Sequence, residues 1–262
     1  MRRTDFHASN LQVSWSIAQR SLMLIPRIPS TFFPSLIMPL FLTVSFGGQF
    51  AGLALLPGFP TDQILNWFIP MATVQGAAFA GITTGLGVAR DLESGFFDRF
   101  LLSSANRSAL VAGPLLAGVL RALLPVTLLT VVVLVSDASF VGGFMGWITL
   151  LVACLGIALV GGAWAFGLAV RFKSMQAAPL MQIGVFLTVF LSTAQMPLDL
   201  IQGWLNRVAS INPMTEVLAL AREGFLGNVT WSGTWPGLVA LAGMVAVLVT
   251  FAGRSMQRAF SY

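Results

Sequence analysis

The stretch GWITLLVACLGIALVGGAWAFGLAV, residues 146–170, contains no charged side chain, and its polar residues are Thr149 and Cys154. It is longer than the roughly 20 residues that a helix needs to cross the hydrocarbon core of a bilayer. Its apolar residues are continuous and do not alternate with polar ones, which is the pattern of a helix rather than of a membrane strand. The stretch therefore predicts a helix that spans a membrane.

Similar apolar stretches occur along the whole chain. Of its 262 residues, 56% are hydrophobic and 9% are charged, against about 25% charged in soluble domains. We expect an all-α, polytopic membrane protein with a single transmembrane domain over residues 1–262. The six predicted spans are residues 33–52, 65–88, 109–135, 146–170, 177–194 and 236–252.

The distribution of positive charge predicts how the spans are oriented. Lys and Arg collect in cytoplasmic loops, and eleven of the fourteen basic residues fall at one set of span ends, with Arg207 and Arg222 at the other and Arg121 unassigned. Both termini are therefore expected in the cytoplasm. The basic residues are dispersed between spans and form no patch, which argues against a nucleic-acid partner.

An amphipathic helix is predicted before the first span, within a cytoplasmic or interfacial segment over residues 1–30. Apolar residues recur there at spacings of three and four, which is typical of a helix lying on the membrane surface; they are Leu11, Trp15, Ala18, Leu22 and Ile25. Pro26 and Pro29 then interrupt it. The alternative is a simple extension of the first span.

The chain offers no set of catalytic or metal-binding residues. Its one histidine, His7, and its one cysteine, Cys154, are far apart in the sequence, so neither a triad nor a metal site is expected. It also lacks a complete phosphate-binding loop, because Phe172 stands where a P-loop needs its second glycine. We expect neither enzymatic activity nor a bound cofactor.

The loop after the second span, within residues 90–108, mixes charges with aromatic residues. The apolar side chains fall on one side of a short helix, which favours a docking element at the cytoplasmic face; a solvated loop that touches lipid headgroups is the alternative. The candidate docking residues are Arg90, Asp91, Glu93, Gly95, Phe96, Phe97, Asp98, Arg99, Phe100 and Leu101.

The segment between the last two spans, residues 195–230, is too apolar for a free loop and too interrupted for a span. Prolines are favourable at the first position of a helix, so Pro197 and Pro213 predict two short helices that enter the outer leaflet and return. A surface hairpin packed on the spans is the alternative. The residues singled out in this segment are Pro197, Trp204, Asn212, Pro213, Glu216 and Arg222.

Polar residues within the spans are candidates for a substrate path, although such side chains often only bond a neighbouring helix; they are Gln75, Thr83, Thr84, Gln182 and Gln195. Gly81 and Gly85 form a GxxxG pair, which fits packing between protomers or within the chain. Arg121 either reaches the cytoplasmic face or lines a wet cavity. Acidic residues are absent from the predicted spans, which argues against a proton- or sodium-coupled carrier.

Two motifs, in this order among six spans, resemble the type-2 ATP-binding-cassette (ABC-2) exporter permease family, and most closely its daunorubicin/doxorubicin-resistance branch. They are the residues from Glu93 to Leu101, and Asn212-Pro213-Met214-Thr215 followed by Arg222 and Gly227. One departure is Ser104, which stands where the family often has a proline; it leaves the end of the docking helix open.

The resemblance implies a pore made by two permeases, this chain with a second copy or a paralogue. It implies two copies of a separate ATPase subunit, which carry the ATP and magnesium, and a coupling role for the 90–108 loop. The expected cargo is a hydrophobic drug or lipid, with a lipid-linked glycan or polysaccharide as the alternative. A secondary transporter and a membrane scaffold are the rival classes.

Overall fold

A computed structural model of the chain describes residues 10–23, 29–97, 106–136 and 138–260. Within these residues all regular structure is helical, which confirms the all-α prediction for them. The α-helices are α1 (Asn10–Met23), α2 (Pro29–Gln49), α3 (Ile64–Glu93), α5 (Arg107–Val135), α6 (Gly143–Phe172), α7 (Ala178–Phe190), α8 (Gly203–Ile211), α9 (Pro213–Leu226) and α10 (Trp231–Ala259), and the 3₁₀ helices are η1 (Ala51–Leu55), η2 (Met175–Ala177) and η3 (Leu198–Leu200).

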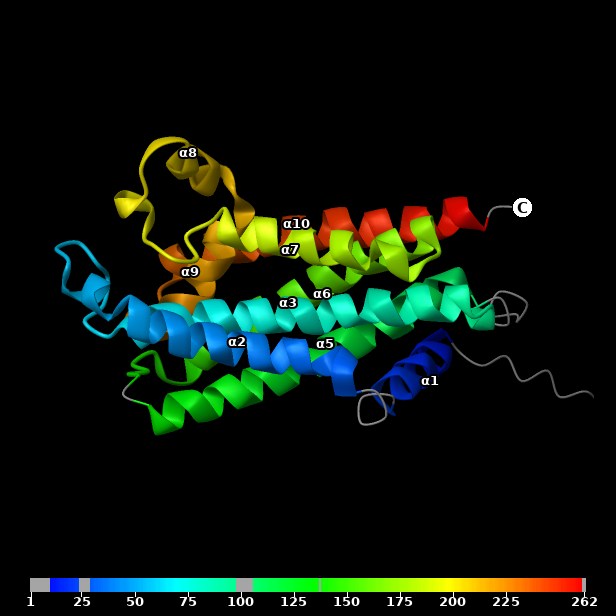
Figure 1. Ribbon diagram of the computed structural model, residues 1–262, viewed down its shortest axis with the longest axis horizontal. Helices are drawn as coiled ribbons and strands as arrows, with labels where there is room; N and C mark the ends of the chain where they lie inside the picture. The colour runs from blue at the N-terminus through cyan, green and yellow to red at the C-terminus, as the bar shows by residue number, and fades with distance from the viewer. Residues whose placement is uncertain (1–9, 24–28, 98–105, 137, 261–262) are drawn as a thin grey trace, which may run out of the picture.

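The long helices form one bundle. In Figure 1, α2, α3, α5, α6, α7 and α10 run along the long axis of the molecule. Helices α8 and α9 gather at the left-hand end, called the α9 end below, while α1 and the last turns of α10 lie at the right-hand end, the α1 end. The outer segment and the end of α3 that leads into the predicted docking loop therefore lie at opposite ends of the bundle.

The bundle has helices at all six places where spans were expected. Among the described residues, α5, α6 and α10 are long and apolar enough to cross a membrane, and shorter apolar helices run over Leu36–Gln49 and Met175–Phe190. Helix α3 is more polar, but nearly all of its middle turns are buried by the other helices. A helix shielded from lipid in this way can carry amides and hydroxyls that bond its neighbours. A count of six spans remains a prediction.

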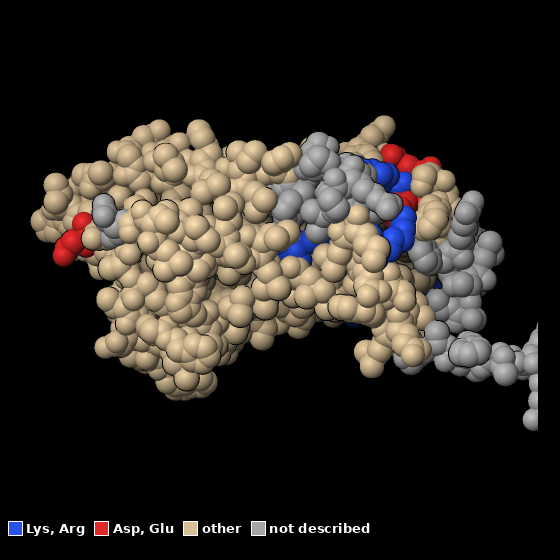
Figure 2. All heavy atoms as spheres, turned by 90° about the horizontal axis from the view of Figure 1, so that it is seen from below, with Lys and Arg blue, Asp and Glu red and all other residues tan. Residues whose placement is uncertain are grey.

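One face of the molecule has a wide zone without visible charged atoms (Figure 2). On the face shown in Figure 2, atoms of Lys and Arg gather toward the right-hand, α1 end, and acidic atoms appear at both ends, while the surface between them is free of charged residues. Such an uncharged zone is what lipid tails require.

Glycines bring α3 and α6 into close contact. A Cβ added at Gly81 would lie 2.1 Å from the carbonyl oxygen of Ala158, and one at Gly85 would lie 2.4 Å from the Cβ of Ala165. The two backbones touch where these residues lack side chains, as small residues allow in membrane helix pairs. Of the two uses considered for the GxxxG pair, packing within the chain is therefore the one observed.

Helix α1 is a separate helix before α2, and one of its faces packs on the bundle, while its place at a membrane surface stays a prediction. Its buried residues are Ser14, Ile17 and Ala18, and the Ser14 hydroxyl donates to the carbonyl oxygen of Ala109 in α5 at 3.4 Å. Leu11 and Trp15, expected on the same face as Ala18, are exposed. The helix docks on α5 through small residues, because Gly113 of α5 leaves room for Ile17.

Several helix ends differ from the predicted spans. Helix α3 continues to Glu93 and α7 ends at Phe190, while α10 already begins at Trp231 and includes Pro236 within its second turn. Pro125 lies within α5, which continues to Val135. Hydropathy marks the apolar middle of a helix, whereas its ends depend on caps and packing.

Candidate functional site

The predicted docking loop begins on a helix. Arg90, Asp91 and Glu93 belong to the last turn of α3 and not to a loop, which corrects the predicted start of this element. Ser94 caps the helix, and Gly95 follows with a φ of +69°. This left-handed conformation favours glycine and commonly ends a helix. The chain therefore turns sharply at Gly95, and the carboxylates of Asp91 and Glu93 are held by rigid backbone.

Asp91 ties the end of α3 to α1. The Arg20 guanidinium donates two hydrogen bonds to the Asp91 carboxylate, at 2.7 and 3.0 Å, and its central carbon lies 4.1 Å from the ring centroid of Phe96. Two-pronged arginine–carboxylate pairs are among the stronger charge-assisted hydrogen bonds and fix orientation as well as distance. Helix α1 is therefore joined to both α3 and the start of the docking segment.

Glu93 ties the end of α3 to the connection between α6 and α7. Its Oε1 accepts hydrogen bonds from the Ser174 hydroxyl at 2.8 Å and from the Met175 backbone N–H at 2.7 Å. The N–H bond from Met175, followed by the Ser174 bond, holds the pKa of the exposed Glu93 carboxyl below its usual value. Met175 is the first residue of η2, which leads directly into α7.

Phe97 ties the docking segment to the end of α10. Its side chain is 4% exposed, and its ring stacks on Phe260 with 6.1 Å between centroids. The Lys173 ammonium lies 4.8 Å from the Phe260 ring centroid, and Arg107 donates to the Phe260 carbonyl oxygen at 2.7 Å. Phe97 was expected to be an exposed apolar anchor for a partner; this is wrong for its side chain, which packs within the chain.

Four residues of the predicted docking set, Asp98, Arg99, Phe100 and Leu101, lie outside the described residues, as does Ser104. Their coupling role stays a prediction. We refer to Arg20, Asp91, Glu93, Phe96 and Phe97 as the coupling site. Its contacts reach α1, the α6–α7 connection and α10. A displacement of the segment around Gly95 would therefore act on each of these elements.

The outer segment contains three short helices, η3, α8 and α9, and prolines stand at the start of η3 and α9 but not of α8. Pro197 caps η3, and Pro213 is the first residue of α9. Asn212 links them to the bundle: its Oδ1 accepts from the Met214 backbone N–H at 3.0 Å, and its Nδ2 donates to the Thr188 and Leu191 carbonyl oxygens at 2.8 and 2.9 Å. Trp204 and Glu216 are exposed on α8 and α9. How deeply this segment enters a membrane remains a prediction.

Arg222 of α9 is the most buried charged residue described, at 1% exposure. Its Nε donates to the Trp67 carbonyl oxygen at 3.2 Å, and its two terminal nitrogens donate to the carbonyl oxygens of Thr193 and Ala194, each at 2.8 Å. The guanidinium carbon lies 3.6 Å from the ring centroid of Trp67. Arg222 thus joins α9 to α3 and to the turn after α7.

The candidate path residues do not meet in one place. Gln75 is fully buried, and its amide has no hydrogen-bond partner among the residues that the structure describes. Gln195 is half-buried in the turn after α7. Thr83 and Thr84 line one cavity, where the Thr83 hydroxyl accepts from Arg121, whereas Gln182 lines another cavity between α2, α3 and α7. The described residues of one protomer therefore do not bring the five together, and their role in a path between two protomers stays a prediction.

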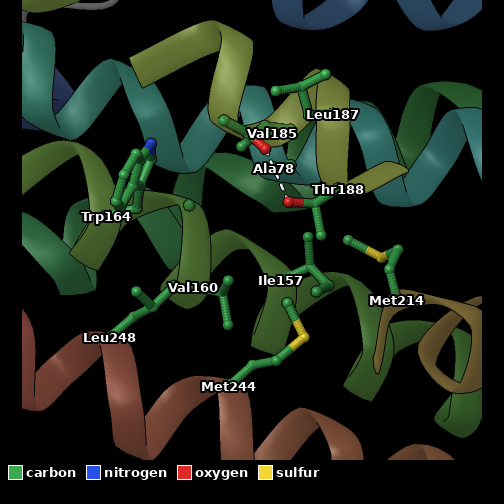
Figure 3. A pocket seen from close by; sticks show the side chains of 12 residues that line it. Ala78, Ile157, Val160, Trp164, Val185, Leu187, Thr188, Met214, Met244 and Leu248 are labelled. Atoms are coloured by element: carbon green, nitrogen blue, oxygen red, sulfur yellow. Dashed lines mark hydrogen bonds between the residues drawn. The ribbon is translucent and has the colours of Figure 1, made fainter. Parts of the chain in front are cut away.

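A separate cavity, which the polar pattern did not indicate, lies among α3, α6, α7, α9 and α10 (Figure 3). It has a volume of about 380 Å³, and its lining is almost wholly apolar. In Figure 3, Met244 and Leu248 face it from α10, Ile157, Val160 and Trp164 from α6, and Met214 from α9. The Thr188 hydroxyl at its edge already donates to the Gly184 carbonyl oxygen at 2.7 Å. Such a site suits an apolar molecule.

Sequence reasoning missed several residues of these sites. Arg20, Phe260, Ser174 and Trp67 were not singled out. Their contacts join residues far apart in the chain, and three of the bonds to Arg222 are made by backbone carbonyls, which carry no signal in the sequence. The useful signal for Arg20 was an arginine in a short amphipathic helix that precedes the first span.

The fold and this site define a helical membrane protein. The last turn of its helix α3 anchors a charged and aromatic segment, as expected of the membrane subunit of a transporter. A family model described as ABC-2 type transporter matches residues 12–226. The chain belongs to this family, and it is a membrane permease subunit of an ABC exporter, a class that works with an ABC ATPase subunit.

Relatives support this assignment. The chain is 28% identical over 240 residues, 87% of its length and 80% of the relative's, to the daunorubicin resistance ABC transporter permease protein DrrB1 of Streptomyces coeruleorubidus. It is 26% identical, over 84% of its length and 75% of the relative's, to the putative transport permease ycf38 of Porphyra purpurea. It is 24% identical, over 68% of its length and 50% of the relative's, to the probable multidrug ABC transporter permease YbhR of Escherichia coli strain K12.

Proposed function

We propose that this chain forms, with a second permease, the membrane pathway of an ATP-driven exporter for a hydrophobic drug or lipid. Two separate ATPase subunits, which hold the ATP and magnesium, would dock at the α1 end around the segment after Gly95. The pathway would contain six spans from each permease, in a bacterial plasma membrane with both termini in the cytoplasm. A drug-resistance permease among the relatives supports this choice of cargo.

The observation that carries the coupling role is the attachment of one segment to three others. Asp91 is bonded to Arg20 of α1, Glu93 to the start of η2, and Phe97 is packed on Phe260 at the end of α10. A solvated loop needs none of these contacts. Movement of a docked ATPase would be transmitted through these contacts to the spans on both sides of α3. The spans would then rock as a body, which is the motion that alternating access requires.

The cavity in Figure 3 supports an apolar cargo over a glycan. Glycan recognition needs several polar groups that replace the hydration of the sugar hydroxyls. This cavity is lined by aliphatic, methionine and tryptophan side chains, and the Thr188 hydroxyl already donates to a backbone carbonyl. An apolar molecule entering it would gain about 25 cal/mol for each Å² of apolar surface removed from water.

The test is reconstitution of the permease with its ATPase in proteoliposomes, with ATP hydrolysis measured against added hydrophobic compounds. We expect compounds of this class to stimulate hydrolysis in the complex. Arg20→Gln, which removes the Asp91 partner, should lower that stimulation severalfold while the permease still inserts and binds the ATPase. Arg207→Gln, an exposed arginine at the α9 end, is the matched control.

Stimulation that is unchanged in Arg20→Gln would remove the coupling role of the α1 contact. Efficient export without the ATPase would instead support an ATP-independent carrier. Stimulation by lipid-linked glycans alone would replace the proposed cargo while leaving the coupling site intact.

A further inference from the structure

A second cavity, of about 200 Å³, lies at the α1 end among α1, α3 and α5. Unlike the apolar cavity of Figure 3, it is rich in polar and charged groups. Its lining includes Arg20 and Ser21 from α1, Thr83, Arg90 and Asp91 from α3, and Arg121 from α5. The coupling site uses Arg20 and Asp91, but it does not use the cavity that they border.

Among the described residues that line this cavity, basic side chains outnumber acidic ones. Its lining contains three arginines, Arg20, Arg90 and Arg121, and one acid, Asp91, so the formal sum is 3 − 1 = +2. The Asp91 carboxylate already accepts two hydrogen bonds from Arg20. Asp91 is thus the one carboxylate that the described part of the lining contains, and it is already bonded to Arg20.

Arg121 is a buried cation of this cavity whose bonded partners are neutral. It is 8% exposed, and it donates to the Thr83 hydroxyl at 3.0 Å and to the Ser21 carbonyl oxygen. Its Nε–H has no hydrogen-bond partner among the described residues. A buried guanidinium is costly unless it is paired and all its N–H groups are bonded. Both of these partners are neutral, so a negative group in the cavity would lie beside a buried guanidinium that no described carboxylate pairs.

We propose that this cavity binds a phosphate group. Arginine is the side chain that best matches the oxygens of a phosphate, through parallel N–H donors. A cavity needs roughly 10–15 Å³ of comparable volume to hold one water, so 200 Å³ accommodates a phosphate with several waters. Basic pockets between membrane helices at the cytoplasmic side are known to take lipid headgroups.

The phosphate could belong to an anionic lipid or be free in solution, and the surroundings favour the lipid. On α1, beside the cavity, Leu11, Trp15 and Met23 are 82%, 48% and 64% exposed. Apolar side chains that remain outside the protein core suit contact with acyl chains. A lipid whose headgroup enters the cavity and whose tails lie along α1 would hold α1 against α3 and α5, next to the coupling site.

The experiment compares ligands that differ only in the phosphate. The full-length permease, purified in a non-ionic detergent, is mixed with phosphatidic acid, with diacylglycerol of the same chains, or with inorganic phosphate, and its thermal unfolding midpoint is followed against ligand concentration. We expect a saturable rise with phosphatidic acid and none with diacylglycerol. A similar rise with millimolar inorganic phosphate would identify free phosphate as the ligand.

Two variants locate the effect. Arg121→Gln and the exposed Arg90→Gln should each weaken the apparent affinity about tenfold or more, while Arg207→Gln, at the α9 end, should bind like the wild type. If Arg121→Gln does not fold, Arg90→Gln alone decides the matter. Equal affinities in wild type and Arg90→Gln, or equal responses to phosphatidic acid and diacylglycerol, would overturn the proposal. The measurement needs no transport, so it stands apart from the test of export.

Discussion

The carboxylate of Glu93, the last residue of α3, accepts the backbone N–H of Met175, the first residue of η2, at 2.7 Å. One side chain therefore joins the end of the central helix to the start of the segment that becomes α7. The Ser174 hydroxyl adds a second bond to the same oxygen at 2.8 Å. We predict that Glu93→Gln lowers compound-stimulated ATP hydrolysis of the reconstituted complex severalfold, because an amide oxygen is a weaker acceptor than a carboxylate.

Glu216→Gln, on the exposed side of α9, serves as the matched control and should keep full stimulation. Binding of the ATPase to the permease should be unchanged in both variants, as measured by co-purification. Loss of ATPase binding in Glu93→Gln would assign this residue to docking and not to transmission.

The same contact predicts a pH dependence. The two hydrogen bonds hold the pKa of the Glu93 carboxyl below its usual value. A lowered pKa in the folded state means that the contact stabilises the fold above the unfolded pKa, and that this contribution is lost as the pH falls through the folded pKa. The thermal unfolding midpoint of the wild type should therefore exceed that of Glu93→Gln at neutral pH, and the two should converge in acid. A constant difference across this range would contradict the assignment.

Part of this architecture could be predicted from the sequence. The uncharged run 146–170 lies within α6, and the prolines at 197 and 213 mark the starts of η3 and α9. These features are local: apolar length and proline geometry act within a few residues. The positions of the other short helices and of the helix ends depend on packing, which is why α3 was expected to stop before Arg90.

The candidate sites were harder to predict, and the reasons are physical. The aromatic residues of the docking segment were expected to be exposed together, yet Phe97 packs on Phe260, which directly follows α10. Arg222 was counted with the outer loop charges, yet its side chain is buried. Backbone carbonyls bond its guanidinium and make this burial possible. Every residue type has a backbone carbonyl, so no sequence pattern predicts which carbonyls will bond a buried arginine.

Arg222 should be essential for stability. Replacing it with Met leaves the carbonyl oxygens of Trp67, Thr193 and Ala194 without their donors in a buried place. At about 1–3 kcal/mol for each unsatisfied group, the loss should reach at least about 3 kcal/mol. Arg222→Lys should restore only part of the lost stability, because a single ammonium group cannot reach all three carbonyl oxygens as the planar guanidinium does. Arg207→Met, at an exposed site, should change the unfolding free energy little; an equal loss there would contradict the argument.

The contact between α3 and α6 should tolerate no side chain at Gly81. An alanine Cβ would lie 2.1 Å from the Ala158 carbonyl oxygen, so the two backbones must separate, at a cost of about 1–3 kcal/mol. Gly87, on the same helix, has no atom within 4 Å of an added Cβ, and Gly87→Ala should stabilise by up to about 1 kcal/mol through helix propensity. Thermal unfolding of both variants in detergent gives the comparison, and a stable Gly81→Ala would show that the helices separate easily.

The apolar cavity of Figure 3 makes the last prediction, which concerns cargo binding. Met244 of α10 borders this cavity, whereas Val247, three residues further along the same helix, is 67% exposed. Met244→Trp replaces the methionine side chain by a larger, ring-containing one at the edge of a cavity of about 380 Å³. The volume left for an apolar molecule therefore shrinks. The concentration of compound that half-maximally stimulates ATP hydrolysis should rise about tenfold or more. Val247→Trp adds the same side chain on the exposed side of α10 and should leave that concentration unchanged. Equal values for the two variants would move the cargo site elsewhere, for example to the interface between the two permeases.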